Sequence, residues 1–455
     1  MEKTLLSEIA IACDGVLEGE DREIFEISTD TRTIKEGSLF VAIRGENFDG
    51  HDFCRAAYEN GASALLVERK VDYPLPQIIV DDTRKAQLLF AKHYRSKFVI
   101  PVVGVTGSVG KTTTKEMIYA VLSSEFKTLK TEGNFNNDIG VPKMIFRLDG
   151  TYQAAVFEMG MSDLNEITHL SKAAMPTVSV ISNIGVSHLE NLKTRENILK
   201  AKLEILDGMA DDAPLIINID NDMLSTVKLD RKVITVAIEN KNADCTAENI
   251  VQKDEKTFFD ITYNAETYPA FVPTIGIHNV YNALEAFCVG VQVGIEPKKC
   301  ADALAGYVTT GMRQRVRKEK SIVFIEDCYN ASPDSQKAGL NALKDIEAKR
   351  HIAVLGDMLE LGAVSKQAHY DVGKYAAEKG IDMVFALGEE SQSIFFGAKE
   401  NGIDSSFHFL SKDELSKKLL ECLQPGDAVI FKASRGMKLE EVIKNIYKGM
   451  GIENE

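Results

Sequence analysis

The pattern of apolar and polar positions divides the chain into three stretches of alternating strands and helices. Up to about residue 98, the short apolar runs Gly37–Ile43 and Ala64–Val67 are separated by turns and by a helical stretch near Asp52–Asn60. From Pro101 onward, buried-strand runs alternate with helical patterns, and a further cycle of strands follows Arg313. This alternation is typical of α/β domains built on a mostly parallel sheet.

The two larger stretches are expected to supply most of the strands. The central runs lie at Val102–Val105, Ala154–Phe157, Thr177–Ile181, Leu215–Ile219 and Val233–Val236, and the C-terminal runs at Ile322–Ile325, Ile352–Leu355, Met383–Leu387 and Ala428–Phe431. A helix-like segment follows each C-terminal run, as in a Rossmann-like domain. We therefore predict an α/β protein of three domains: a small α/β N-terminal module over residues 1–98, a central parallel-sheet domain over 99–312, and a Rossmann-like C-terminal domain over 313–455.

The composition agrees with a folded protein of several domains. The 455 residues exceed the roughly 250 to 300 at which one hydrophobic core stops growing. Acidic residues outnumber basic ones by 68 to 53, and the net charge of −15 argues against a nucleic acid or an anionic membrane as the main partner. Any anionic ligand must therefore be held by local donors.

The cysteines and the first residues favour a cytoplasmic protein. The seven cysteines form no CxxC pair and show no zinc-ligand spacing, so reduced thiols are expected. The N-terminal residues lack the apolar stretch of a signal peptide. The longest uncharged, apolar-leaning run, Ala173–Leu189, is interrupted by Pro176, Asn183 and Gly185, so no membrane span is expected.

A glycine-rich segment, TGSVGKTTT at residues 106–114, lies between the expected strand at Val102–Val105 and a helical stretch at Thr112–Ser123. This order is that of a phosphate-binding loop, whose backbone N–H groups surround an anion. Lys111 would neutralise the β- and γ-phosphates, and the Thr112 hydroxyl would bind Mg²⁺. The first glycine, Gly104, comes one residue earlier than the usual spacing requires. The segment predicts a P-loop mononucleotide-binding domain with a nucleoside triphosphate site, in preference to an ordinary turn.

Two titratable residues follow central strands. Glu158 comes directly after the run Ala154–Phe157, and His188 follows the run Thr177–Ile181. Ligands of open α/β sheets bind at the carboxyl edge, where both side chains are expected to emerge. Taken alone, His188 is more readily explained as a structural hydrogen-bonding residue. Beside a triphosphate, a carboxylate and an imidazole become candidate Mg²⁺ ligands, the carboxylate being the more usual one.

Two helical segments carry polar residues that could have purely structural roles. Lys200 and Lys202 lie in a segment with apolar residues at helical spacing, and composition alone makes both lysines solvated charges. Asn279 lies near a helix start, where it could simply be an N-cap. Asn282 is one turn further along the same face, so the two amides could instead bind a purine edge.

Several segments together resemble the ATP-dependent Mur ligases of peptidoglycan precursor synthesis. In family order they are TGSVGKTTT (106–114), GNFNNDIGVP (133–142), SNIGVSHLE (182–190), KAKLEI (200–205) and HNVYNALEA (278–286). The segments DCYNASPDS (327–335), GDMLELG (356–362) and KASR (432–435) resemble the members that add D-alanyl-D-alanine to UDP-N-acetylmuramoyl-tripeptide. The resemblance implies an ATP-dependent amide ligase that works through an acyl phosphate and forms the pentapeptide precursor of peptidoglycan.

The resemblance also implies roles for individual residues. ATP would be bound by Gly107, Ser108, Val109, Gly110, Lys111, Thr112, Thr113, Asn279, Asn282, Arg313 and Asp327. Two Mg²⁺ ions would be held by Thr112, Glu158, His188 and a carbamylated Lys202. Catalysis would rest on Lys111, Glu158, His188 and Lys202. The two small-molecule substrates would contact Thr31, Arg32, Asn134, Asn136, Asn137, Asn330, Lys432, Ser434 and Arg435. Carbamylation by CO₂ would turn a metal-repelling ammonium into an anion that can bind the metal.

Two other functions stay open on the sequence alone. Another Mur-type or folylpolyglutamate-type ligase would add a single amino acid. A P-loop switch or motor would hydrolyse ATP without an amine acceptor, although Glu158, His188 and Lys202 disfavour it. The sequence carries no signature that distinguishes lysine from diaminopimelate as the third peptide residue. We expect the protein to be a monomer.

Overall fold

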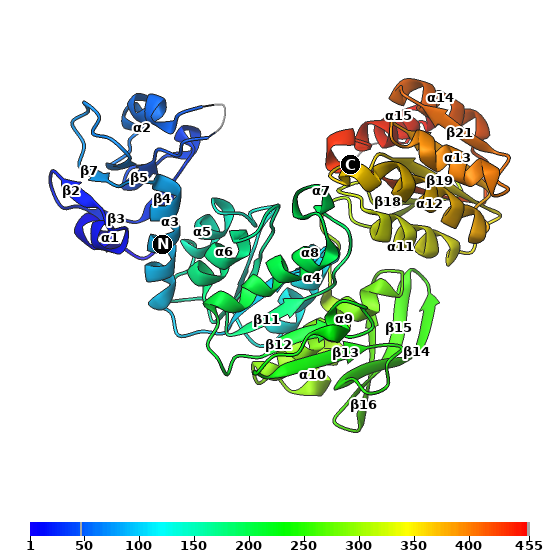
Figure 1. Ribbon diagram of the computed structural model, residues 1–455, viewed down its shortest axis with the longest axis horizontal. Helices are drawn as coiled ribbons and strands as arrows, with labels where there is room; N and C mark the ends of the chain where they lie inside the picture. Colours follow the sequence, from blue (N-terminus) through cyan, green and yellow to red (C-terminus); the bar gives the residue numbers. More distant parts are fainter. Residues whose placement is uncertain (46–47, 453–455) are drawn as a thin grey trace.

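The computed structural model describes residues 1–45 and 48–452, and it shows three bodies in a row along the longest axis (Figure 1). An N-terminal module in blue is followed by a central domain in cyan to green and a C-terminal domain in yellow to red. Each body has a mainly parallel sheet of its own. The prediction of a three-domain α/β protein is confirmed, while residues 453–455 of the expected C-terminal domain lie outside the described ranges.

The N-terminal module contains a sheet of order β2-β7-β6-β5-β4, in which only β2 runs antiparallel to its neighbour. Its strands are β1 (Thr4–Leu5), β2 (Val16–Glu18), β3 (Glu23–Ile24), β4 (Glu26–Ser28), β5 (Ser38–Val41), β6 (Ala64–Val67) and β7 (Gln77–Ile79), and its helices are α1 (Leu6–Ala12), α2 (Cys54–Glu59) and α3 (Thr83–Ser96). The two apolar runs predicted as strands are the buried strands β5 and β6.

The central domain contains a long sheet of order β16-β15-β14-β13-β12-β11-β8-β10-β9. Its strands are β8 (Val102–Thr106), β9 (Thr128–Lys130), β10 (Ala154–Glu158), β11 (Val178–Ile181), β12 (Leu215–Asn218), β13 (Val233–Ala237), β14 (Cys245–Lys253), β15 (Lys256–Tyr263) and β16 (Glu266–Val272). Its helices are α4 (Lys111–Ser123), α5 (Gly140–Ile145), α6 (Glu166–Ala174), α7 (Leu189–Leu192), α8 (Arg195–Leu203), α9 (His278–Gln292) and α10 (Pro297–Ala303). Strand β8 pairs in parallel with both β10 and β11, which makes its carboxyl end a topological switch point.

Helix α3 connects the N-terminal module to the central domain. It packs against α1 of its own module and against α5 and α6 of the central domain. Tyr94 of α3 is fully buried, and its hydroxyl donates a hydrogen bond of 2.6 Å to the carbonyl of Leu148. Apolar residues of both bodies form one continuous core around this helix. The module is therefore held against the central domain by packing and not only by a linker.

Strands β14 to β16 extend the central sheet as an antiparallel meander that the sequence pattern did not reveal. The outer parts of these strands are partly exposed, so they alternate in polarity and contain no long apolar run. The meander also contacts the C-terminal domain. The Gln252 side-chain amide donates to Asp345 at 2.7 Å, and Glu255 pairs with Lys318 at 2.8 Å.

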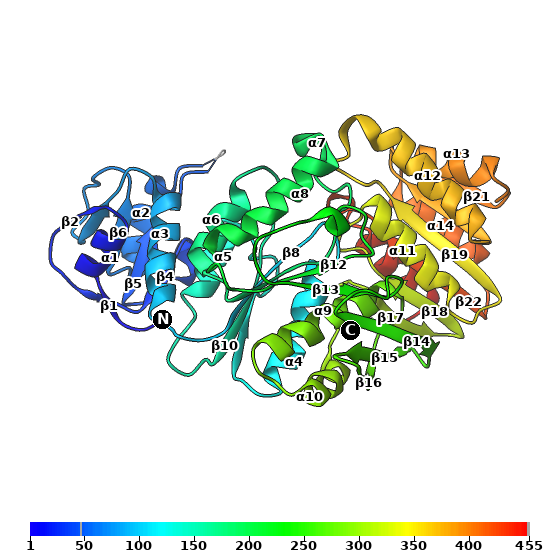
Figure 2. The same ribbon diagram turned by 60° about the horizontal axis from the view of Figure 1, so that its bottom comes forward.

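The C-terminal domain has a sheet of order β17-β18-β22-β19-β20-β21, parallel except for β17. Its strands are β17 (Arg315–Glu319), β18 (Ile322–Glu326), β19 (Arg350–Gly356), β20 (Met383–Leu387), β21 (Ser406–Phe409) and β22 (Asp427–Lys432), and its helices are α11 (Pro333–Lys344), α12 (Ser365–Glu378), α13 (Gln392–Glu400), α14 (Lys412–Cys422) and α15 (Glu440–Met450). Helices α11 to α13 cover one face of the sheet, and α14 and α15 cover the other (Figure 2). The Rossmann-like prediction is confirmed. None of the helices in the described ranges combines the length and the apolar character needed to cross a membrane.

Candidate active site

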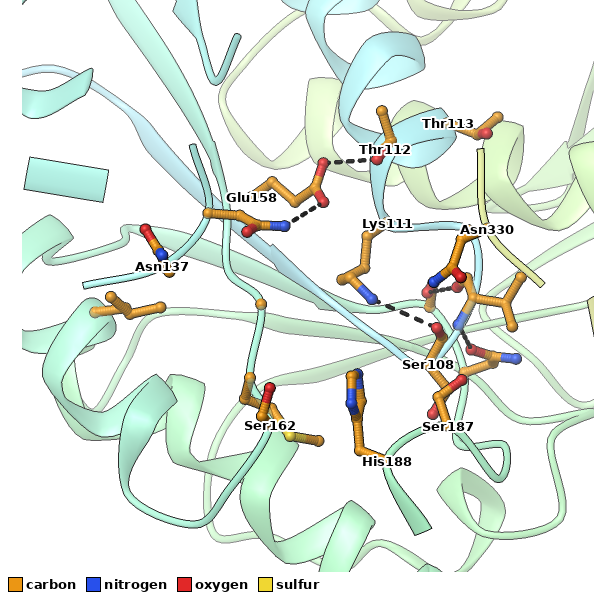
Figure 3. Close-up of a pocket in the computed structure, with 18 of the residues that line it drawn as sticks. Ser108, Lys111, Thr112, Thr113, Asn137, Glu158, Ser162, Ser187, His188 and Asn330 are labelled. Carbon is orange, nitrogen blue, oxygen red and sulfur yellow. Dashed lines mark hydrogen bonds between the residues drawn. The ribbon is translucent and has the colours of Figure 1, made fainter. Parts of the chain in front are cut away.

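A cavity of about 1210 Å³ lies where the carboxyl edge of the central sheet faces the C-terminal domain (Figure 3). The central domain lines it with the loop residues 108–113 and with residues that follow β10, β11 and β12. The C-terminal domain contributes Asp327, residues 329–332, Asp334, Ser335 and Lys432, and helix α3 contributes Arg84 and its neighbours. The cavity is therefore enclosed by all three parts of the chain.

The glycine-rich loop connects β8 to α4, as the sequence predicts. Its conformation depends on Gly110, whose φ of +87° is in the left-handed region. The segment after β11 holds the loop in place, because the backbone N–H of Val109 donates to the Asn183 side chain at 2.7 Å. The Ser182 hydroxyl donates to the Val109 carbonyl at 2.6 Å. The same hydroxyl oxygen leaves no room for a side chain at Gly107, where a Cβ would lie only 2.0 Å from it. The loop is preformed around the space that an anion would occupy.

Lys111 is folded back into this loop. Its ammonium donates to the carbonyl of Gly107 at 2.7 Å and makes a longer contact of 3.4 Å with the carbonyl of Ser108. Loss of hydration lowers the pKa of the Lys111 ammonium, and the nearby Glu158 carboxylate acts in the opposite direction. Neutral carbonyl groups do not compensate this half-buried charge, so an anionic ligand would be strongly favoured here.

Glu158 lies at the end of β10 with only 3% of its surface exposed. One carboxylate oxygen accepts a hydrogen bond of 2.8 Å from the Thr112 hydroxyl, and the other accepts one of 3.0 Å from the Asn136 amide (Figure 3). Mg²⁺ in nucleotide sites usually takes one or two carboxylates together with phosphate oxygens. A buried carboxylate and a hydroxyl beside a phosphate-binding loop fit that ion.

His188 follows β11 and points into the cavity toward Lys111, as expected from its place in the sequence (Figure 3). Its Nδ1 lies 2.7 Å from a carboxylate oxygen of Glu360, a residue of the C-terminal domain. The histidine therefore contacts two domains. No sequence pattern indicated Glu360 as its partner, because 172 positions of the chain separate the two residues and only the docking of the domains brings them together.

Lys202 is buried in the protein, with 1% of its surface exposed, whereas Lys200 on the same helix is exposed. The interpretation of Lys202 as a solvated charge is wrong, because α8 turns this side chain into the protein interior. Within the residues that the structure describes, the Lys202 amine has no hydrogen-bond or ion-pair partner. Burial, and next the charge of Lys111, bring the pKa of the Lys202 amine far below its usual value.

Asn279 and Asn282 lie inside α9, and the N-cap interpretation of Asn279 is wrong, because the helix begins at His278 after Ile277. The Asn279 amide donates to the carbonyl of Ile275 at 2.6 Å and to Gln314 at 2.9 Å. The predicted shared face is confirmed, since the Asn282 amide donates to the Asn279 oxygen at 3.2 Å. Asn282 lines the cavity, while Asn279 lies behind it.

Glu285, one turn after Asn282, is fully buried and accepts a hydrogen bond of 3.0 Å from the Thr114 hydroxyl. Its second oxygen, Oε1, has no partner among the described residues. Burial raises the pKa of the Glu285 carboxyl to about 8. The carboxyl is therefore protonated in the folded protein at neutral pH, when it would be ionised in the unfolded chain.

We predict that Glu285→Gln stabilises the protein increasingly as the pH rises from 5 to 8. Below the unfolded-state pKa of about 4.3, the wild-type carboxyl is protonated in both the folded and the unfolded state. The free energy of unfolding of the variant should there differ little from that of the wild type. Above that pH, the carboxyl is ionised in the unfolded chain but keeps its proton in the folded protein. This difference lowers the stability of the wild type by about 1.4 kcal/mol for each pH unit until the folded-state pKa is reached. Urea unfolding at pH 5 and pH 8 measures the difference. Glu248→Gln, on an exposed ion pair, is the control, and parallel pH profiles for Glu285→Gln and wild type would contradict the prediction.

The C-terminal domain brings several predicted residues to the same cavity. Asp327 pairs with Lys432 at 2.7 Å, and Lys432 also donates to the Asn330 carbonyl at 3.3 Å. The Arg313 guanidinium lies 4.0 Å from the centre of the Tyr329 ring. All of these residues line the cavity.

Other predicted residues, all in the described part of the chain, lie outside the cavity lining: Thr31, Arg32, Gly107, Asn134, Lys202, Ser434 and Arg435. Thr31 and Arg32 are in the N-terminal module, where the Arg32 guanidinium pairs with Asp30 at 2.7 Å. Asn134 is exposed. Ser434 and Arg435 follow β22, where the Ser434 hydroxyl accepts from the Leu359 N–H and Arg435 pairs with Glu440. Asn137, in contrast, lines the cavity together with Asn136.

The structure adds residues that sequence reasoning did not single out. Asp334, at the start of α11, lines the cavity, and burial raises the pKa of its carboxyl. Its oxygen lies so close to Gly185 that a Cβ there would be 2.3 Å away. On the opposite wall, cationic side chains come from α3 and α6: Arg84, Lys85, Lys92 and Lys172. Sequence analysis did not place these residues together, because they lie on two helices that are far apart in the sequence.

Comparison with known proteins agrees with this geometry. Three family models match the chain: Mur ligase family, catalytic domain, at residues 23–103; Mur ligase middle domain at 105–290; and Mur ligase, glutamate ligase domain, at 312–435. The UDP-N-acetylmuramoyl-tripeptide--D-alanyl-D-alanine ligase of Bacillus subtilis (strain 168) is 39% identical over 456 residues, which cover 98% of this chain and 99% of that protein.

Solved structures show the same similarity in three dimensions. A crystal structure of MurF from Acinetobacter baumannii has a TM-score of 0.93 at 29% identity and covers 98% of this chain and 99% of its own. The MurF ligase of Thermotoga maritima in complex with ADP has a TM-score of 0.85 at 30% identity and covers 94% of this chain and 98% of its own. With matching family models, full-length sequence identity and the same fold, the chain belongs to the Mur ligase family.

Proposed function

We propose that this chain is an ATP-dependent ligase that joins D-alanyl-D-alanine to UDP-N-acetylmuramoyl-tripeptide. One observation carries the proposal: a preformed phosphate loop meets Glu158 and His188 at one sheet edge, across a cavity from a second domain. The buried Lys202 amine lies behind this site, near enough for the charge of Lys111 to lower the pKa of the amine. The name of the B. subtilis relative and the ADP complex of the T. maritima protein support the choice of substrates and of ATP.

ATP and Mg²⁺ would occupy the central side of the cavity. The loop residues 107–110, Lys111 and the hydroxyls of Thr112 and Thr113 would surround the phosphates, although the N–H groups of Ser108 and Val109 already donate to Asn183 in this structure. Asn279, Asn282, Arg313 and Asp327 would contact the nucleoside and the phosphates from the other side. Two Mg²⁺ ions would be held by Thr112, Glu158, His188 and Lys202 in its carbamate form, and they would neutralise charge on the transferred phosphoryl group.

The carbamate on Lys202 has a chemical basis in this environment. Only an unprotonated amine attacks CO₂, and its N–H proton is released when the C–N bond forms. Burial lowers the pKa of the Lys202 amine and so increases the fraction that is unprotonated and able to react. The resulting anion would lie near the Lys111 ammonium and relieve the repulsion between the two lysines.

The reaction would proceed in two transfers. The terminal carboxylate of the tripeptide attacks the γ-phosphorus of ATP, ADP leaves, and an acyl phosphate forms. The amine of the dipeptide then attacks the acyl carbon, phosphate leaves, and the ammonium proton is lost. Lys111 stabilises the phosphate charge in the first transfer. Closure of the C-terminal domain over the cavity would exclude water that would hydrolyse the acyl phosphate and would hold amine and carbonyl in near-attack geometry.

The three domains would divide the substrates among them. Residues 1–98, with Thr31 and Arg32, would bind the uridine diphosphate; residues 99–312, with Asn134, Asn136 and Asn137, would bind ATP and the peptide; and residues 313–455, with Asn330, Lys432, Ser434 and Arg435, would bind the dipeptide. The enzyme would act as a monomer in the cytoplasm.

The test measures phosphate release with both cosubstrates and with each one omitted. The ligase predicts release only when ATP, UDP-N-acetylmuramoyl-tripeptide and D-alanyl-D-alanine are all present, and transfer of ¹⁸O from the tripeptide carboxylate to phosphate. Lysine-containing and diaminopimelate-containing tripeptides should be compared. Turnover with a single amino acid would indicate another Mur-type or folylpolyglutamate-type ligase, and turnover without any amine would indicate a P-loop switch.

A further inference from the structure

The contact between His188 and Glu360 joins the phosphate site to the C-terminal domain. The two side chains lie 2.7 Å apart, Nδ1 to Oε2, and the Glu360 side chain is 60% exposed. A second bond fixes the same segment, because the Glu190 N–H donates to the Glu360 carbonyl at 3.2 Å. Gly362 also lies against Glu190, where a Cβ would meet the Glu190 Cα at 3.3 Å. The loop after β19 is therefore docked on the first turn of α7, and Figure 1 shows α7 reaching toward the C-terminal domain.

Both partners have an uncommon backbone conformation. His188 has a φ of +63° and Glu360 a φ of +65°, in the left-handed region that residues other than glycine seldom adopt. Such conformations cost free energy and persist where the surroundings determine them, often at functional positions. Here two of them occur at the two ends of one close contact between domains.

The pairing determines which nitrogen of the neutral His188 ring is free. A carboxylate only accepts hydrogen bonds, so Nδ1 carries the proton and Nε2 keeps its lone pair. No described residue forms a hydrogen bond or ion pair with Nε2, and the ring points into the cavity (Figure 3). Histidines that bind metals usually donate their other ring N–H to a carboxylate or carbonyl, which fixes the tautomer and the ring orientation.

We propose that Glu360 is a positioning residue, supplied by the C-terminal domain, that holds His188 in its metal-binding tautomer and so couples docking of that domain to Mg²⁺ binding. The proposal rests on the proposed role of His188 toward Mg²⁺. Since Glu360 reaches His188 only when the domain is docked, docking raises the affinity for Mg²⁺. By thermodynamic reciprocity, Mg²⁺ with nucleotide then favours docking. The cavity would close when the phosphates are in place.

The test measures the MgCl₂ concentration that half-saturates binding of AMP-PNP, a non-hydrolysable ATP analogue, to the full-length protein. Glu360→Gln keeps the shape of the side chain and removes its charge, and it should raise that concentration about 10- to 100-fold. Glu255→Gln is the matched control, since Glu255 pairs with Lys318 across the same two domains without touching the cavity. It should leave the MgCl₂ requirement unchanged.

A second measurement addresses coupling. Small-angle scattering should show the wild-type protein becoming more compact when MgCl₂ and AMP-PNP are added, and the Glu360→Gln variant responding only at the higher MgCl₂ concentration. An unchanged MgCl₂ requirement in Glu360→Gln, or an equal shift in both variants, overturns the proposal. Neither result bears on the ligase itself, which fails only if the wild-type protein shows no phosphate release that depends on the dipeptide.

Discussion

Replacing Lys111 by alanine is expected to lower kcat by about 10³-fold. Lys111 supplies the positive charge inside the phosphate loop, and one preorganised charge or donor at a developing anion contributes on the order of 10² to 10³ in rate. The effect should appear in kcat as well as in the KM for ATP, because charge on the phosphoryl oxygens changes during the transfer. Steady-state kinetics of phosphate release with both cosubstrates measures it.

The stability of the Lys111→Ala variant separates this effect from misfolding. Among the residues that the structure describes, the ammonium donates only to carbonyl oxygens of its own loop, and burial lowers the pKa of Lys111, so the charge is not a source of stability. The thermal midpoint should therefore stay the same or rise. A variant that is folded and turns over at nearly the wild-type rate would show that Lys111 does not hold the reacting phosphate.

Replacing Lys202 by alanine should lower turnover by about 100-fold or more, because the site would lose the anion proposed to bind the second metal. Added bicarbonate should not restore activity, since alanine has no amine to carbamylate. The control is Lys200→Ala, two residues away on the same helix but exposed, which should behave like wild type.

A spectroscopic measurement tests the modification directly. With ¹³C-labelled bicarbonate, the wild-type protein and Lys200→Ala should show a carbamate carbonyl signal in the ¹³C NMR spectrum that is missing from Lys202→Ala. Near-normal turnover by Lys202→Ala, or the same ¹³C signal in that variant, would rule out a carbamate at this position.

Elements with strong local signals were predicted well. Buried strands such as β6 and β20 match the apolar runs residue for residue, because both faces of a parallel strand are covered and every position selects for apolar side chains. The meander β14 to β16 and the edge strand β17 were missed, since their exposed positions carry polar residues. The phosphate loop was found because its glycines, lysine and threonine are contiguous.

Residues whose environment depends on distant segments were predicted less well. Lys202 has the same local composition as Lys200, yet only Lys202 faces the core, and its depressed pKa follows from that burial. Asn279 follows a plausible helix start, but the helix begins one residue before it, and the amide bonds to Gln314 at the entry to the C-terminal domain.

The sequence alone therefore determined the α/β class, the three-domain order and the nucleotide loop, since each depends on periodicity or spacing within one segment. Only the tertiary structure decided which side chains share the cavity, that Glu285 and Lys202 are buried, and that Glu360 reaches His188 from another domain. Burial and contact between distant segments arise from packing, and packing is a property of the whole chain that no local pattern carries.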